Sequence, residues 1–76
     1  MLCIVTSEKE TIEYKDVQSA KIEATTGTLQ ILPGHAECFL AFLEGRLELL
    51  TQGDVVEVKH PDGFCHIKDD TITVIV

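Results

Sequence analysis

Three turn signals divide the second half of the chain into short segments of similar length. Gln52-Gly53, Pro61-Asp62-Gly63 and Lys68-Asp69-Asp70 supply residues that tolerate or pre-set turn dihedral angles. The segments between them are rich in Val, Ile and Thr, whose branched Cβ atoms suit a pleated sheet better than a helix. Short strands at this spacing are typical of a sandwich or a barrel. We predict strands at Arg46–Thr51, Asp54–His60, Phe64–Lys68 and Thr71–Val76.

The first half of the chain continues the same pattern. We predict strands at Leu2–Thr6, Thr11–Tyr14 and Val17–Ala24. Ile12 and Tyr14 fall on one face of the second of these strands, because side chains alternate along a strand with a period of two. An all-β chain is therefore expected.

The segment Glu37–Leu43 is the exception, because its apolar run does not alternate with polar residues. Gly45 is placed to cap a helix that ends at Glu44, so the pattern alone leaves helix and strand equally open. Apolar residues on a short run usually fill the interior of a domain. On that ground we expect core positions for Phe39, Phe42 and Leu43.

Composition limits the classes of function. A chain of 76 residues has room for one domain, residues 1–76, with a small core. The net charge of −7 and the scattering of the six basic residues argue against binding to nucleic acid or to anionic lipid. Without a long apolar run or a signal peptide, the chain is expected to be soluble and unexported. Its three cysteines form no C-x-x-C pair, which suits a reducing compartment.

One motif points to a known family. The stretch Gly27-Thr28-Leu29-Gln30-Ile31-Leu32-Pro33-Gly34-His35-Ala36 combines a β-favouring run, a Pro-Gly corner and a His, and it resembles a signature of the F-type ATP synthase epsilon subunit. Further matches follow in order at Leu2-Cys3-Ile4-Val5-Thr6-Ser7-Glu8, Val17-Gln18-Ser19-Ala20, Leu43-Glu44-Gly45-Arg46-Leu47, Gly63-Phe64 and Thr71-Ile72-Thr73-Val74. The resemblance implies a flattened β-sandwich of about eight to ten short strands. It also implies that Glu37–Leu43 is a strand buried on both faces, and that the helical hairpin which normally follows is absent from these residues.

The resemblance assigns three residues to the interface with the rotating stalk subunit, namely Thr6, His35 and Leu40. His35 follows the Pro-Gly corner, where a turn can present an imidazole to a partner. Taken alone, a single His is weak evidence, and bonding to local backbone groups is the simpler interpretation. Core packing is the competing interpretation for Leu40.

A second contact, with the membrane ring, is implied for the loop that contains Thr26, Gly27 and Thr28. Here the sequence departs from the family, in which many members carry an acidic residue at the position of Thr28 and a Gly at that of Gln30. Hydrogen bonds from Thr hydroxyls are a weaker substitute, at roughly 0.5–1.5 kcal/mol each. A solvated turn is an equally good interpretation of this loop.

Signals for other chemistry are weak. His60, Cys65 and His66 are suitable zinc ligands by type, but adjacent residues of a strand point to opposite faces and no fourth ligand has a recognised spacing. We therefore expect no metal site. The sequence also lacks a nucleophile elbow and a phosphate-binding Gly loop, so an enzyme is not expected. Family members that bind ATP do so through the helical hairpin, so no cofactor is expected either.

The resemblance implies a non-catalytic epsilon subunit of a bacterial F-type ATP synthase. Its partners would be the gamma (stalk) subunit and the c-ring, and its place the cytoplasmic face of the plasma membrane. There it would couple ion-driven rotation of the ring to ATP synthesis. The alternative is a free-standing β-sandwich adaptor or small-ligand module. An apolar pocket between the sheets would favour that alternative, whereas an exposed apolar patch beside His35 would favour the rotor role.

Overall fold

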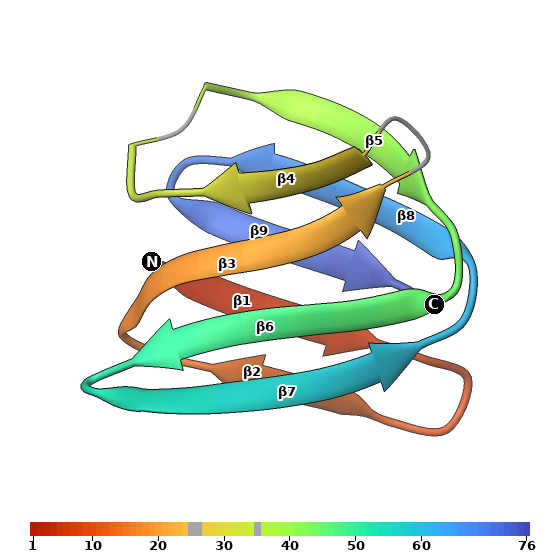
Figure 1. Cartoon of the computed structure of the whole chain (residues 1–76), viewed down its shortest axis with the longest axis horizontal. Coiled ribbons are helices and arrows are strands. Elements are labelled where there is room, and N and C mark those ends of the chain that lie inside the picture. The colour runs from red at the N-terminus through yellow and green to blue at the C-terminus, as the bar shows by residue number, and fades with distance from the viewer. Residues whose placement is uncertain (25–26, 35) are drawn as a thin grey trace.

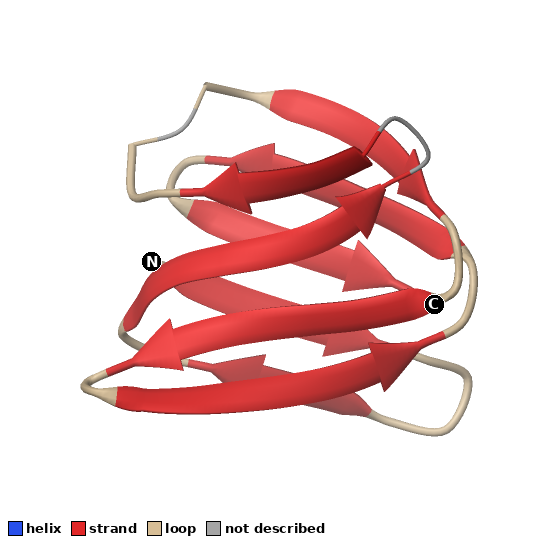
Figure 2. Cartoon of the chain, viewed as in Figure 1, coloured by secondary structure: helices blue, strands red, loops and turns tan. Residues whose placement is uncertain are grey.

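The computed structural model describes residues 1–24, 27–34 and 36–76, and in those ranges it contains strands and connecting turns without a helix (Figures 1 and 2). This confirms the predicted all-β class. The strands are β1 (Leu2–Thr6), β2 (Thr11–Tyr14), β3 (Val17–Ala24), β4 (Gly27–Ile31), β5 (Cys38–Phe42), β6 (Gly45–Thr51), β7 (Asp54–His60), β8 (Gly63–Lys68) and β9 (Thr71–Ile75).

The strands form two sheets that face each other as a sandwich (Figure 1). The five-stranded sheet has the order β2-β1-β9-β8-β5 and the four-stranded sheet the order β4-β3-β6-β7. Neighbouring strands are antiparallel except for β1 and β9, which are parallel. The chain alternates between the sheets, adding a hairpin each time except for the single strand β5, so each sheet combines segments that are distant in sequence.

Residues with positive φ close the tight hairpin turns. Gln52 and Gly53 join β6 to β7 with φ of 41° and 89°, and Asp69 and Asp70 join β8 to β9 with φ of 51° and 58°. Two consecutive positive φ values are the signature of a type I′ turn, whose twist matches that of antiparallel strands. The turn signals in the sequence are thus confirmed, and they explain why several strand bounds were predicted to within a residue.

The core lies between the two sheets and is built from one face of each strand. Along β9, for example, Ile72 and Val74 are buried while Ile75 is exposed. On β7, Val56 and Val58 are only half-buried, because β7 is an edge strand. The buried apolar residues are Cys3, Val5, Val17, Ala20, Ile22, Ile31, Phe42, Leu47, Leu49, Cys65, Ile67, Ile72 and Val74.

Strand β5 corrects two expectations. The strand interpretation of this segment is confirmed, but its expected burial on both faces is wrong. Phe42 is 2% exposed, whereas Phe39 is 70% and Leu43 57% exposed, so the core positions expected for the latter two are also wrong. The reason is that the four-stranded sheet covers only the inner face of the five-stranded sheet, and Phe39 points away from it.

Candidate interaction surface

The centre of the outer face of the five-stranded sheet carries no formal charge, and its charged residues lie at the margins. Its side chains lie in rows that cross the strands, as the registers of the sheet define, and the row of Leu2, Thr71 and the charged Lys68 lies at one end. One row contains Thr11, Thr6, Ile75, Phe64 and Ala41. The next row contains Glu13, Ile4, Thr73, His66 and Phe39. We call the part of these rows on β1, β9, β8 and β5 the neutral face: Ile4, Thr6, Phe39, Ala41, Phe64, His66, Thr73 and Ile75.

Three large apolar residues of the neutral face remain open to solvent. Phe39 is 70%, Phe64 56% and Ile75 49% exposed. Phe64 stands directly opposite both Ile75 and Ala41 in register, so the apolar side chains adjoin one another across β9, β8 and β5. A contiguous exposed apolar patch on a small domain marks a site of interaction rather than a random feature of its surface. The neutral face is therefore the candidate interaction surface.

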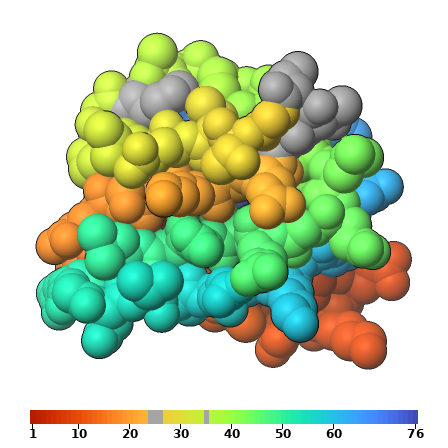
Figure 3. All heavy atoms as spheres, viewed as in Figure 1, coloured from red at the N-terminus to blue at the C-terminus, as the bar shows by residue number. Residues whose placement is uncertain are grey.

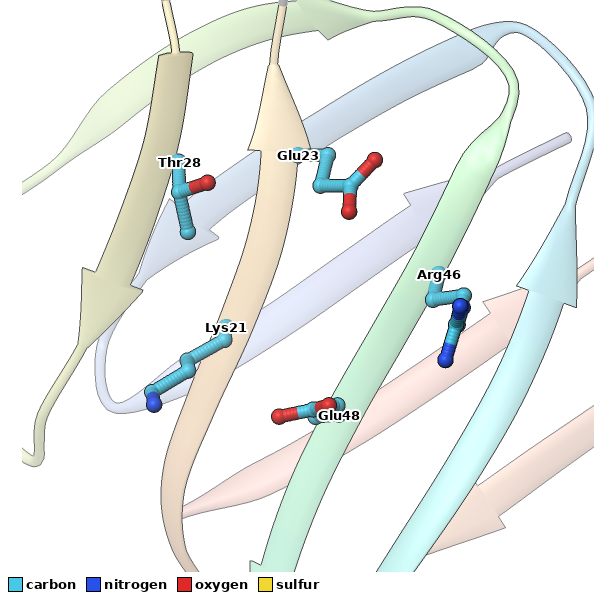
Figure 4. Close-up of a pocket in the computed structure, with 5 residues that line it drawn as sticks. All are labelled: Lys21, Glu23, Thr28, Arg46 and Glu48. Atoms are coloured by element: carbon cyan, nitrogen blue, oxygen red, sulfur yellow. The ribbon is translucent and has the colours of Figure 1, made fainter.

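The outer face of the four-stranded sheet, which is toward the viewer in Figure 3, carries charged side chains. Charged residues of both signs lie on it, and Arg46 Nη1 lies 2.7 Å from Glu57 Oε1. That hydrogen bond and the carboxylate charge raise the pKa of Arg46 above its ordinary value. A hollow in this face lies over β3, β4 and β6 (Figure 4). It is lined by Lys21, Glu23, Thr28, Arg46 and Glu48.

An aromatic stack occupies one corner of the neutral face. The rings of Phe39 and His66 lie 4.4 Å apart between centroids, with 14° between their planes. His66 Nε2 lies 3.1 Å from Glu37 Oε2, and the His66 side chain is 29% exposed. From the sequence alone, His66 is only a weak candidate for a metal ligand and Phe39 is expected in the core. The pairing of β5 with β8 brings the two together, and no local signal in the sequence records that pairing.

The predicted stalk-subunit residues are placed differently from one another. Thr6 is half-buried on the neutral face, where it stands opposite Ile75. Leu40 lies on the other side of its sheet, is half-buried and packs against the core. His35 lies outside the described residues. The structure thus places Thr6 beside the exposed apolar patch and separates it from Leu40 by the thickness of the sheet.

Of the residues predicted to contact the membrane ring, Gly27 and Thr28 begin the edge strand β4 and are both exposed. Thr26 lies outside the described residues. Thr28 stands opposite Glu23 in register, so a carboxylate lies one strand away from the position where the family commonly has one.

The cysteines and histidines considered as metal ligands are dispersed. Cys65 is buried in the core while His66 lies on the neutral face, as the alternation of a strand predicted. His60 is buried on β7 in the other sheet, with its ring 4.5 Å from that of Phe42. Within the described ranges, no three His, Cys, Asp or Glu side chains are grouped to hold a metal ion. Burial raises the pKa of the Cys3 and Cys65 thiols to about 12, so both are protonated at neutral pH.

The family follows from comparison with known proteins. A family model described as the beta-sandwich domain of the ATP synthase Delta/Epsilon chain matches residues 1–76. The chain belongs to this family. The delta/epsilon sandwich family is one of non-catalytic ATP synthase subunits, as the sequence predicted. In the described part of the chain, no helix is long and apolar enough to cross a membrane.

Relatives of the delta/epsilon family resemble the chain in sequence. It is 31% identical over 72 residues to the ATP synthase epsilon chain of Trichodesmium erythraeum (strain IMS101), a match that covers 95% of this chain and 53% of the relative. It is 36% identical over 55 residues to the epsilon chain of Prochlorococcus marinus (strain MIT 9211), covering 72% of this chain and 41% of the relative. The chain thus spans about half the length of the curated relatives it matches.

Solved structures share the fold. A chain of the mitochondrial ATP synthase of Euglena gracilis superposes with a TM-score of 0.89 at 22% identity, over 97% of this chain and 48% of that chain. A chain from the central stalk and c-ring of the Tetrahymena thermophila mitochondrial ATP synthase gives a TM-score of 0.84 at 12% identity, over 100% of this chain and 62% of that chain. At these identities the comparison shows the sandwich fold alone.

Proposed function

We propose that the chain is the sandwich of an epsilon subunit in a bacterial F-type ATP synthase and that it docks on the gamma (stalk) subunit through the neutral face. One observation carries this proposal: a chain with a net charge of −7 presents a face of exposed apolar side chains without charge at its centre. Thr6, which the family resemblance assigns to the stalk interface, lies on the same face. The family membership of the chain supports the same partner.

The surface of the domain is large enough for such a contact. A standard interface buries about 800 Å² on each partner. That is roughly a sixth of the 4828 Å² of accessible surface of this domain. Because the centre of the face carries no formal charge, docking removes little ionic hydration, and covering each exposed Phe contributes up to roughly 1.5–3 kcal/mol before the entropy of association is subtracted.

In this role the domain works mechanically and not as a catalyst. Held by the stalk on the neutral face, it contacts the c-ring through the loop of Thr26, Gly27 and Thr28, so that ring and stalk turn together and drive ATP synthesis. The carboxylate of Glu23 beside Thr28 offers this contact an acidic group. The subunit is then peripheral, at the cytoplasmic face of the bacterial plasma membrane.

A pair of matched substitutions tests the proposal. Phe64→Glu places a charge in the neutral face, and Val55→Glu places the same charge on the outer side of β7, at a residue that is 68% exposed. We expect Phe64→Glu to abolish co-purification with the gamma subunit, because the carboxylate would be buried without a partner. Val55→Glu should co-purify like the unmodified chain. Retention of the Phe64→Glu variant by the gamma subunit would contradict the proposed docking face.

The alternative of a small-ligand module receives less support. Such a module takes its ligand in a largely apolar cavity with a few polar groups. The hollow in Figure 4 is instead lined by charged and hydroxyl side chains on an open sheet surface, while apolar side chains pack between the sheets.

A further inference from the structure

Phe39 is a highly exposed aromatic residue whose ring is held in place. It stands directly opposite His66 in the register of β5 and β8, so the two side chains are neighbours on the same face. The imidazole lies nearly parallel to the ring at 4.4 Å between centroids. One side of the Phe39 ring is therefore covered by His66, and 70% of the residue stays exposed.

Glu37, the residue before β5, completes the arrangement. Its Oε2 lies 3.1 Å from His66 Nε2, which fixes the plane of the imidazole. An imidazole protonated on Nε2 donates this bond whether or not the second nitrogen carries a proton, so the bond does not depend on the charge of the ring. Glu37 and His66 together restrict the positions that the Phe39 ring can adopt.

We infer that Phe39 is the anchor residue of the neutral face and that His66 and Glu37 are its positioning residues. Binding energy at protein interfaces concentrates in a few aromatic anchors that fill pockets of the partner. An anchor that is already ordered loses less side-chain entropy on docking than a free one. This inference rests on the proposed function and names the part of the face that determines affinity.

The chemistry of the cluster defines what the gamma subunit must present. Its surface needs an apolar pocket that receives the open side of the Phe39 ring. At the rim of that pocket it needs a basic group, because Glu37 is 58% exposed and its carboxylate belongs to a chain with a net charge of −7. An acidic rim on the partner would be repelled.

Four variants of the chain separate the anchor from its support. Phe39→Ala removes the ring, His66→Ala leaves the ring without its stack, and His66→Phe restores an aromatic stack without the bond to Glu37. Val55→Ala is the control, because Val55 is as exposed as Phe39 but lies on the other sheet. The dissociation constant for the purified gamma subunit is measured for each, together with the thermal unfolding midpoint to verify folding.

We expect Phe39→Ala to weaken binding about 30-fold, the range of an interface hot spot. His66→Ala should weaken it about 5- to 10-fold, mainly through faster dissociation, and His66→Phe should recover most of that loss, within about 3-fold of the unmodified chain. Val55→Ala should bind normally.

The outcomes distinguish this inference from the proposed function. Normal binding by Phe39→Ala, while Phe64→Glu still abolishes binding, would overturn the anchor and leave the docking face standing. Equal losses for His66→Ala and His66→Phe would overturn the positioning role of the stack. Failure of the unmodified chain to bind the gamma subunit would overturn the proposed function and this inference with it.

Discussion

Gly63 at the start of β8 is a position where adding one methyl group should unfold part of the protein population. A Cβ atom there would overlap the carbonyl oxygen of Ile75 on β9 and would lie 3.1 Å from Val76 Cγ1. The oxygen belongs to backbone that is fixed from both sides, since Ile75 pairs with Phe64 and with Thr6 in the centre of the sheet. Gly63→Ala therefore forces the first residues of β8 away from β9.

The magnitude follows from two opposing terms. Overpacking of this kind costs about 1–3 kcal/mol, and the upper half of the range applies because a backbone carbonyl cannot rotate away. Replacing Gly by Ala also restricts the unfolded chain, which returns about 0.4–1 kcal/mol. The net loss of unfolding free energy should be about 2 kcal/mol, or a decrease of about 8–16 °C in the melting temperature of a domain of this size.

Gly45→Ala provides the control within the same protein. Gly45 also begins a strand, but a Cβ atom there would meet the carboxylate of Glu23, with its Oε2 at 2.8 Å. That carboxylate ends a flexible side chain and can turn aside, so Gly45→Ala should be neutral within about 0.5 kcal/mol. Urea unfolding followed by far-UV circular dichroism measures both variants. Equal stability of Gly63→Ala and the unmodified chain would refute the packing argument at the edge of β8.

Two further predictions concern the turn at Asp70 and the buried thiols. Asp70 Oδ1 accepts a hydrogen bond of 3.1 Å from the Gly34 amide. Asp70→Gly should therefore accelerate amide hydrogen exchange at Gly34, whereas Asp70→Asn should preserve its protection. Equal exchange rates at Gly34 in the two variants would refute the bond. Burial raises the pKa of Cys3 and Cys65 from 9.0 to about 12. Below pH 9 these thiols are protonated in both the folded and the unfolded chain and do not affect stability. Between about pH 9 and 12 only the unfolded chain releases their protons, so the free energy of unfolding falls as the pH rises. Urea midpoints at pH 8 and 10.5 under reducing conditions should therefore differ less in a Cys3→Ala/Cys65→Ala variant, and an identical pH dependence would contradict this linkage.

The two outer faces of the sandwich show how the fold separates functions. The charged outer face of the four-stranded sheet favours solvent, through pairs such as Arg46 and Glu57. The neutral face of the other sheet leaves Phe39 and Phe64 exposed, at a cost in solubility that a docking partner removes. A partner is therefore expected to bind on one side, with the opposite side remaining hydrated.

Local chemistry in the sequence was sufficient to predict seven of the strands and the turns of the second half. The bounds of β7 at Asp54–His60 were predicted correctly because Gln52-Gly53 precede and Pro61 follows a run rich in β-branched residues. A turn depends on only four consecutive residues, so it can be predicted from local sequence. The turn at Asp69 was equally predictable from the sequence, although its type follows from the φ values. Family resemblance supplied what periodicity left open at β5, the choice of strand over helix.

Only the tertiary structure decided which side of β5 faces the core. Apolar residues occupy both of its faces, so a period of two in the sequence does not indicate which face packs against the second sheet. Phe42 is buried and Phe39 is exposed because the four-stranded sheet covers one side alone. The contact of His66 with Glu37 joins residues 29 positions apart, through a strand pairing that no local pattern encodes. Strand formation depends on neighbours along the chain, whereas an open docking face depends on what the rest of the chain leaves uncovered.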